Sequence, residues 1–149
     1  MPRRPLTVVL SRILLLPYAL GLGLIVWLPG KDAARVTGIV MVIARRLHEY
    51  GIPLRTAYTI MEFLANVALF VPLGLLLALA WPRLRMWLII IAGLVASSTI
   101  ELVQMTLPSR FPTLSDVAAN TLGTAIGCAA VFLVRYLLSD DRESSLPDR

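Results

Sequence analysis

Four long apolar segments alternate along the chain with short polar or charged stretches. The apolar segments cover about 6–28, 57–81, 86–107 and 117–138. Each has close to the 20 residues that an α-helix needs to cross the hydrocarbon core of a bilayer. The pattern therefore predicts an all-α, polytopic membrane protein, in which residues 1–138 form one transmembrane domain built on a four-helix bundle. Residues 139–149, rich in Ser and Asp, are expected to form a disordered tail.

A fifth segment, about 33–50, has a different pattern. Val36, Val40 and Leu47 recur at helical spacing, but Arg45 and Arg46 interrupt the apolar face. The segment is too short and too charged to span comfortably, so we expect an amphipathic helix that lies in the membrane interface. A re-entrant segment is the alternative. We expect residues 33–50 to act as a linker packed on the bundle, in preference to gating a substrate.

Composition supports the membrane class and excludes several functions. The chain is 58% hydrophobic and 15% charged, whereas soluble domains carry about 25% charged residues. The net charge of +5 comes from basic residues at the segment ends, where they meet lipid headgroups, so nucleic acid is not expected as a partner. The single cysteine, Cys128, cannot form a disulfide within the chain, and His48 has no partner at metal-ligand spacing. We expect no metal and no cofactor.

Polar residues gather where three of the apolar segments meet one side of the membrane. Because successive spans alternate in direction, the start of the second span, the end of the third and the start of the fourth share one depth. A charged or amide side chain in a lipid-buried helix is costly and marks a functional site by default. The candidate binding residues are Glu62, Asn66, Glu101, Gln104, Arg110, Asp116 and Asn120.

These residues have two interpretations. Intramembrane amides and carboxylates often join helices to one another, each contributing little stability. The set is larger than a bundle needs for association, which favours a polar pocket that faces a ligand.

Small residues and prolines predict how the helices approach one another. Gly93 and Ser97 are spaced for close helix contact, and Gly123 and Gly127 form a G-x-x-x-G face that suits either contact within the chain or a homodimer. Pro72 frees a backbone carbonyl near Ala68, which needs another partner or a kink. Arg12 is expected to reach the headgroups.

The ordered polar and glycine residues resemble those of the VanZ-like family of small bacterial membrane proteins. The resemblance covers 62–127 and rests on Asn66 with the sequence LFVPLG at 69–74, on Glu101 and Gln104, on Arg110 and Asp116, and on NTLG at 120–123 with Gly127. It implies a four-helix integral membrane protein, and the best-known member is associated with low-level resistance to teicoplanin-type lipoglycopeptides. Thr113 and Ser115 stand where members often carry carboxylates, which weakens any proposal of a divalent-metal site.

Three functions fit these observations. The first is non-enzymatic binding or shielding of cell-envelope lipids or amphiphilic glycopeptide antibiotics at the outer leaflet of the cell membrane. The alternative is a membrane enzyme acting on a lipid-linked isoprenoid phosphate, with Glu62, Glu101 or Asp116 as acid or base and Arg110 holding the phosphate. A proton or solute carrier ranks third, because carriers are usually built from internal repeats and no repeat is evident in this sequence. Eight of the fourteen basic residues lie on the side of the termini, which favours both termini inside.

Overall fold

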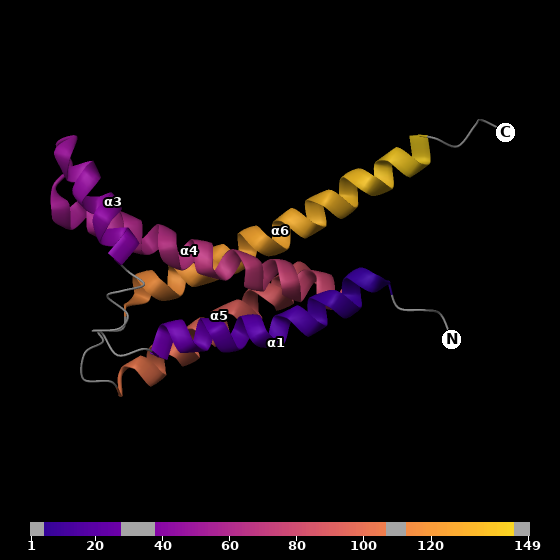
Figure 1. Ribbon diagram of the computed structural model, residues 1–149. Coiled ribbons are helices and arrows are strands. Elements are labelled where there is room, and N and C mark those ends of the chain that lie inside the picture. Colours follow the sequence, from indigo (N-terminus) through magenta and orange to yellow (C-terminus); the bar gives the residue numbers. More distant parts are fainter. Residues whose placement is uncertain (1–4, 28–37, 107–112, 145–149) are drawn as a thin grey trace.

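The computed structural model describes residues 5–27, 38–106 and 113–144, with the side chains of 25–27 and 140–144 left aside. These residues form five helices and no strand (Figure 1). The helices are α1 (Leu6–Trp27), α3 (Gly38–Glu49), α4 (Leu54–Ala80), α5 (Met86–Gln104) and α6 (Leu114–Ser144). The prediction of an all-α polytopic bundle is confirmed.

Several helix boundaries differ from those expected. α4 begins at Leu54, directly after Pro53, and α6 begins at Leu114, so both start one turn earlier than their apolar runs. α6 also continues to Ser144. The tail predicted for 139–149 is thus helical as far as 144, because no Gly or Pro occurs between Gly127 and Pro147 to end the helix. Residues 145–149, and 33–37 of the expected interfacial helix, lie outside the described part.

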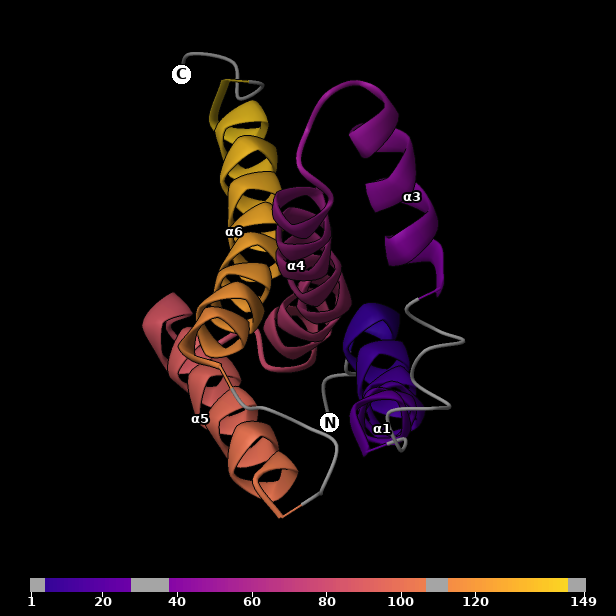
Figure 2. The same ribbon diagram turned by 90° about the vertical axis from the view of Figure 1, so that its left-hand side faces the viewer.

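α4 is the centre of the bundle. It contacts each of the other four helices and packs most extensively against α6, an arrangement visible end-on in Figure 2. Gly123 and Gly127 of α6 allow this contact, because a Cβ at either position would overlap the backbone carbonyl of Val67 or Val71. Both glycines are therefore covered by α4 within one chain.

A second close contact joins α4, α5 and α6. Thr124 of α6 is fully buried, and its backbone lies against Gly74 of α4 while its side chain lies against Gly93 of α5. Neither glycine has room for a Cβ. The expected close approach at Gly93 is confirmed, and the residue that fills the space is the threonine.

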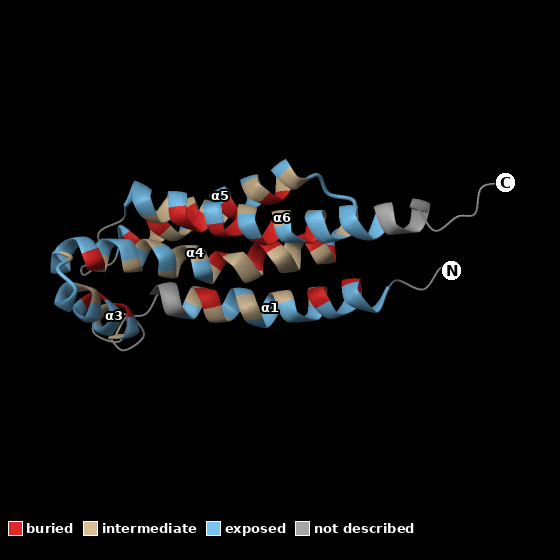
Figure 3. Ribbon diagram, turned by 90° about the horizontal axis from the view of Figure 1, so that it is seen from above, coloured by how far each residue is buried: buried red, intermediate tan, exposed pale blue. Residues whose placement is uncertain are grey.

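Apolar side chains cover the outside of the bundle. Four helices are long and apolar enough to cross a membrane: Leu6–Leu24, Leu54–Ala80, Met86–Gln104 and Leu114–Ser139. Figure 3 shows buried residues where α4, α5 and α6 meet, and α1 mostly exposed. Leucines along α1, such as Leu16 and Leu24, are more than 60% exposed. An apolar surface of this extent is stable in lipid.

The end of α4 is held by two arginines from other helices. Arg12 of α1 donates from Nε to the Ala80 carbonyl (3.0 Å) and lies over the Trp81 ring, and Arg135 of α6 donates from Nη2 to the Ala78 carbonyl (2.8 Å). Carbonyls in the last turn of a helix have no partner within it and carry partial negative charge, which a guanidinium satisfies. Arg12 therefore caps α4, where the sequence suggested a headgroup contact.

At the opposite end, α3 packs on the first turns of α4. Val40 and Ala44 of α3 and Ala57 of α4 are buried. Gly51, with φ +93°, ends α3: its N–H donates to the His48 carbonyl (2.9 Å), and the Ile52 N–H donates to the Leu47 carbonyl (3.3 Å). This Schellman ending turns the chain back into α4.

Candidate functional site

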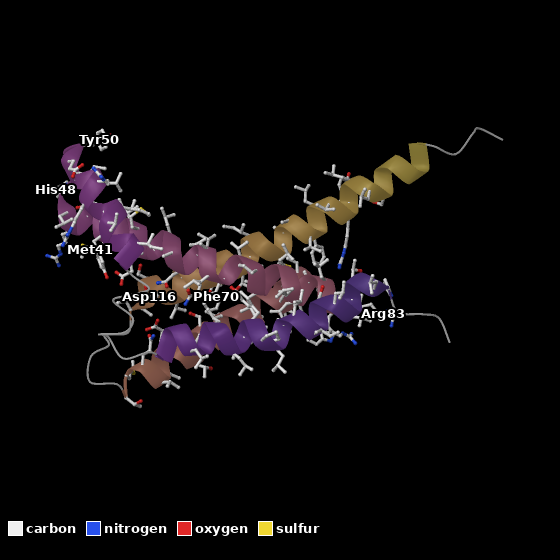
Figure 4. The ribbon with its side chains drawn as sticks, viewed as in Figure 1. Met41, His48, Tyr50, Phe70, Arg83 and Asp116 are labelled. Carbon is white, nitrogen blue, oxygen red and sulfur yellow. The ribbon has the colours of Figure 1, made fainter. Side chains whose placement is uncertain are left out.

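Three helices bring polar side chains to the end of the bundle where α3 lies. Figure 4 shows Asp116 of α6 at this end with Met41 and His48 of α3 and Tyr50 directly after that helix, and Arg83 at the other end. Among the side chains that the structure describes, all four carboxylates lie on this side: Glu49, Glu62, Glu101 and Asp116. We call this region the α3 end.

The first polar contact links α4 to α6. Asn66 donates from Nδ2 to Asp116 Oδ1 (2.7 Å), and both residues are half-buried. Asp116 is the third residue of α6, so its carboxylate also lies where the helix dipole favours negative charge. The sequence placed these two residues at one depth, and the structure brings them into direct contact.

The second contact caps α6 from α5. The Thr113 hydroxyl accepts from the Asp116 N–H (3.1 Å), and the Thr113 N–H donates to Glu101 Oε2 (3.1 Å). In a capping box the acid at the third helical position would accept this N–H. Here Glu101 of the neighbouring helix does so, and Asp116 is left to reach Asn66.

The third contact lies deeper, between α5 and α6. Asn120 donates from Nδ2 to Ser97 Oγ (2.9 Å), and both side chains are buried. The Asn120 Oδ1 atom has no hydrogen-bond partner among the residues described. A buried carbonyl without a donor is rare in native proteins and costs about 1–3 kcal/mol.

The remaining predicted residues are placed differently. Gln104 is buried on the same face of α5 as Ser97 and Glu101. Glu62 is exposed, one turn before Asn66 on α4. Both Gln104 and Glu62 take part in a further interaction, so neither side chain is free. Arg110 lies outside the described residues.

Sequence reasoning did not assign polar roles to Ser97 and Thr113. Ser97 stands one turn before Glu101, so it shares the face of α5 that carries the glutamate. Thr113 stands three residues before Asp116, the spacing of a helix-capping pair. Both spacings are visible in the sequence, but an uncharged hydroxyl marks a site in an apolar helix less strongly than a carboxylate does.

The chemistry available at the α3 end is hydrogen bonding by amides, carboxylates and hydroxyls. Within the described ranges, no three His, Cys, Asp or Glu side chains are grouped closely enough to hold a metal ion. Three of the four described carboxylates, those of Glu49, Glu101 and Asp116, already accept hydrogen bonds from the protein. The arrangement therefore suits recognition of a polar group at the membrane surface.

Comparison with known proteins agrees with this architecture. Neither the curated proteins nor the solved structures gave a match. The family model described as VanZ/LLP1 matches residues 13–135, which include α3, α4 and α5 and most of α1 and α6. The chain therefore belongs to the VanZ/LLP1 family of membrane proteins.

Proposed function

We propose that this VanZ-like membrane protein binds amphiphilic molecules of the cell envelope, either envelope lipids or lipoglycopeptide antibiotics, and shields them at the surface where the α3 end lies. The proposal assigns that end to the outer leaflet of the cell membrane. The opposite end carries Arg83, Arg85 and Arg135 with no described carboxylate, and basic residues favour the cytoplasmic side.

The observation that carries the proposal is the Asn120 carbonyl oxygen. It is buried, in an amide group that donates to Ser97, and accepts no hydrogen bond from the described residues. In a membrane interior water is scarce, so a ligand that brings a hydroxyl or amide N–H recovers this lost hydrogen bond. Sugar hydroxyls of envelope lipids and the peptide groups of glycopeptides are donors of this kind.

The neighbouring contacts support binding ahead of catalysis. Glu101 holds the Thr113 N–H and Asp116 holds Asn66, so both carboxylates act first as acceptors that fix the helices. An acid–base enzyme would need one of them presented to the substrate. Turnover of an isoprenoid-phosphate lipid by the purified protein would reverse this order.

The test compares Asn120→Ala with Thr121→Ala in a bacterial host. Both changes remove a polar side chain from α6, but the Thr121 hydroxyl bonds only within its own helix, to the Val117 carbonyl. We expect Asn120→Ala to lose the envelope or lipoglycopeptide phenotype of the wild type at equal expression, and Thr121→Ala to keep it. If Asn120→Ala and Glu101→Gln both keep every phenotype, the proposal fails.

A further inference from the structure

A cleft lies between α1 and α4. Its volume is about 430 Å³, within the range of pockets that hold small ligands. One wall comes from α1 and the other from α4. The lining residues are Leu14, Pro17 and Tyr18 of α1, and Val71, Pro72, Leu75 and Leu76 of α4.

Two prolines account for the gap between the helices. Pro17 and Pro72 stand on opposite walls of the cleft. Proline lacks a backbone N–H, and its ring disturbs the preceding turn of a helix. Two such turns facing each other do not pack as closely as regular helices do.

The cleft offers no hydrogen bond to an occupant. The one polar side-chain atom in its lining is the Tyr18 hydroxyl, which donates to the Leu69 carbonyl, one turn before Pro72. An apolar space without polar partners does not hold water. A hydrocarbon chain is the occupant that this lining favours.

The cleft lies inside the membrane-spanning parts of α1 and α4. Leu14 on its α1 wall is 54% exposed, so the bilayer reaches the cleft from the side. An empty space here would lose dispersion contacts that an acyl chain restores.

Basic residues follow the cleft toward the end where α4 terminates. Arg12 is two residues before Leu14 of the α1 wall, and Ala80 is four residues after Leu76 of the α4 wall. The hydrogen bond from Arg12 to the Ala80 carbonyl therefore joins α1 to α4 at this end of the cleft. Arg83 and Arg85 are exposed in the turn that follows α4, and no hydrogen bond or ion pair engages either one among the residues described. Figure 4 shows Arg83 at the end of the bundle opposite Asp116. No carboxylate is described at this end.

We infer that this region binds one anionic phospholipid, with an acyl chain in the α1–α4 cleft and its phosphate at Arg83, Arg85 and the outer guanidinium nitrogens of Arg12. Arginine suits phosphate because its planar fork forms paired, charge-assisted hydrogen bonds. The site lies at the opposite end of the bundle from the binding proposed above, and neither depends on the other.

The experiment measures which lipid the purified protein retains. Detergent-solubilised protein is incubated with an equal mixture of phosphatidylglycerol and phosphatidylcholine and examined by native mass spectrometry. We expect the wild type to retain one phosphatidylglycerol in preference to phosphatidylcholine.

Two substitutions fill the cleft, and a third serves as the control. Leu76→Trp and Leu14→Trp place bulk in the cleft from opposite walls and are expected to lower lipid retention about tenfold. Leu16→Trp, on a residue that is 66% exposed and outside the lining, is expected to retain lipid like the wild type. Leu14 is itself exposed, so Leu14→Trp is informative even where Leu76→Trp prevents folding.

The headgroup is tested separately with the double substitution Arg83→Gln and Arg85→Gln. We expect this variant to keep a bound lipid but to lose the preference for phosphatidylglycerol. Lipid retention at the wild-type level in both Leu76→Trp and Leu14→Trp would overturn the inference. An unchanged preference for phosphatidylglycerol in the double variant would also overturn it, and so would a wild-type protein that is dimeric and free of lipid. Asn120→Ala is expected to retain phosphatidylglycerol normally, which separates this result from that of the proposed function.

Discussion

The two ends of the bundle satisfy their polar groups in different ways. Where α4 terminates, guanidinium groups from Arg12 and Arg135 bind backbone carbonyls that every helix leaves open. At the α3 end, side chains bind side chains across helices, as Asn66 does with Asp116 and Asn120 with Ser97.

The difference separates contacts that complete a helix terminus from contacts that the helix backbone does not require. The arginine contacts complete a helix terminus, and the backbone would require a partner there in any membrane protein. The side-chain contacts at the α3 end exceed that need, and they leave the Asn120 carbonyl without a donor. We therefore expect loss of the Arg135 contact to act on stability, and substitution of Asn120 to act on the binding proposed for the α3 end.

The largest effect is expected from breaking the helix contact on which both ends depend. Gly127→Val places a side chain against the Val71 carbonyl, a backbone atom that cannot move aside. We expect a loss of about 3 kcal/mol or more in the free energy of unfolding, measured by denaturation in mixed micelles. Gly21→Val is the control, because a Cβ at Gly21 meets nothing within 4 Å. Equal stability of the two variants would contradict the packing of α4 on α6.

A smaller effect is expected at the arginine end. Arg135→Met keeps most of the side-chain length but removes the donors to the Ala78 carbonyl, which should cost about 1.5–3 kcal/mol. Arg83→Met, at an exposed arginine without a described partner, should change the free energy of unfolding little. The same denaturation assay compares them. A destabilised Arg83→Met with a stable Arg135→Met would reverse the roles assigned to these arginines.

The smallest effect is expected for the Asn66–Asp116 contact. A double-mutant cycle with Asn66→Leu and Asp116→Leu should give a coupling free energy of about 0.6 kcal/mol, the average for hydrogen bonds between membrane helices. A coupling near zero would mean that the two side chains share a depth without contributing to association. A value well above 2 kcal/mol would make the α3 end as structural as the arginine end.

The sequence was sufficient for the fold because membrane helices are specified by length and apolarity. Each span must satisfy its own backbone, so a long apolar run predicts a helix with little ambiguity. The convergence of Asn66 and Asp116 followed from alternating directions alone. The end of α6 differs from the prediction because a charged, Ser-rich composition is typical of a disordered tail, whereas residues 139–144 contain no helix breaker and continue the helix.

The partners of individual side chains could not be predicted from spacing. Arg12 lies near two other arginines in the sequence, which suggested a headgroup contact, and only the arrangement of α1 beside α4 shows that it binds Ala80. The G-x-x-x-G motif of Gly123 and Gly127 indicates a close helix contact but not whether the partner belongs to the same chain. The rotation of each helix about its axis decides which residue Arg12 contacts and which helix covers Gly123 and Gly127. A short apolar pattern predicts this rotation only weakly.

The cap that Arg135 provides for α4 has a consequence for biogenesis. The carbonyl that it binds belongs to Ala78 in the second transmembrane helix, whereas Arg135 is near the end of the last one. While the ribosome is still translating α5, the surface of α4 that receives α6 has no partner within the chain. The bundle can therefore close only after the final span has been inserted, and a nascent chain halted before residue 135 would present that surface to the insertion machinery or to quality-control proteases.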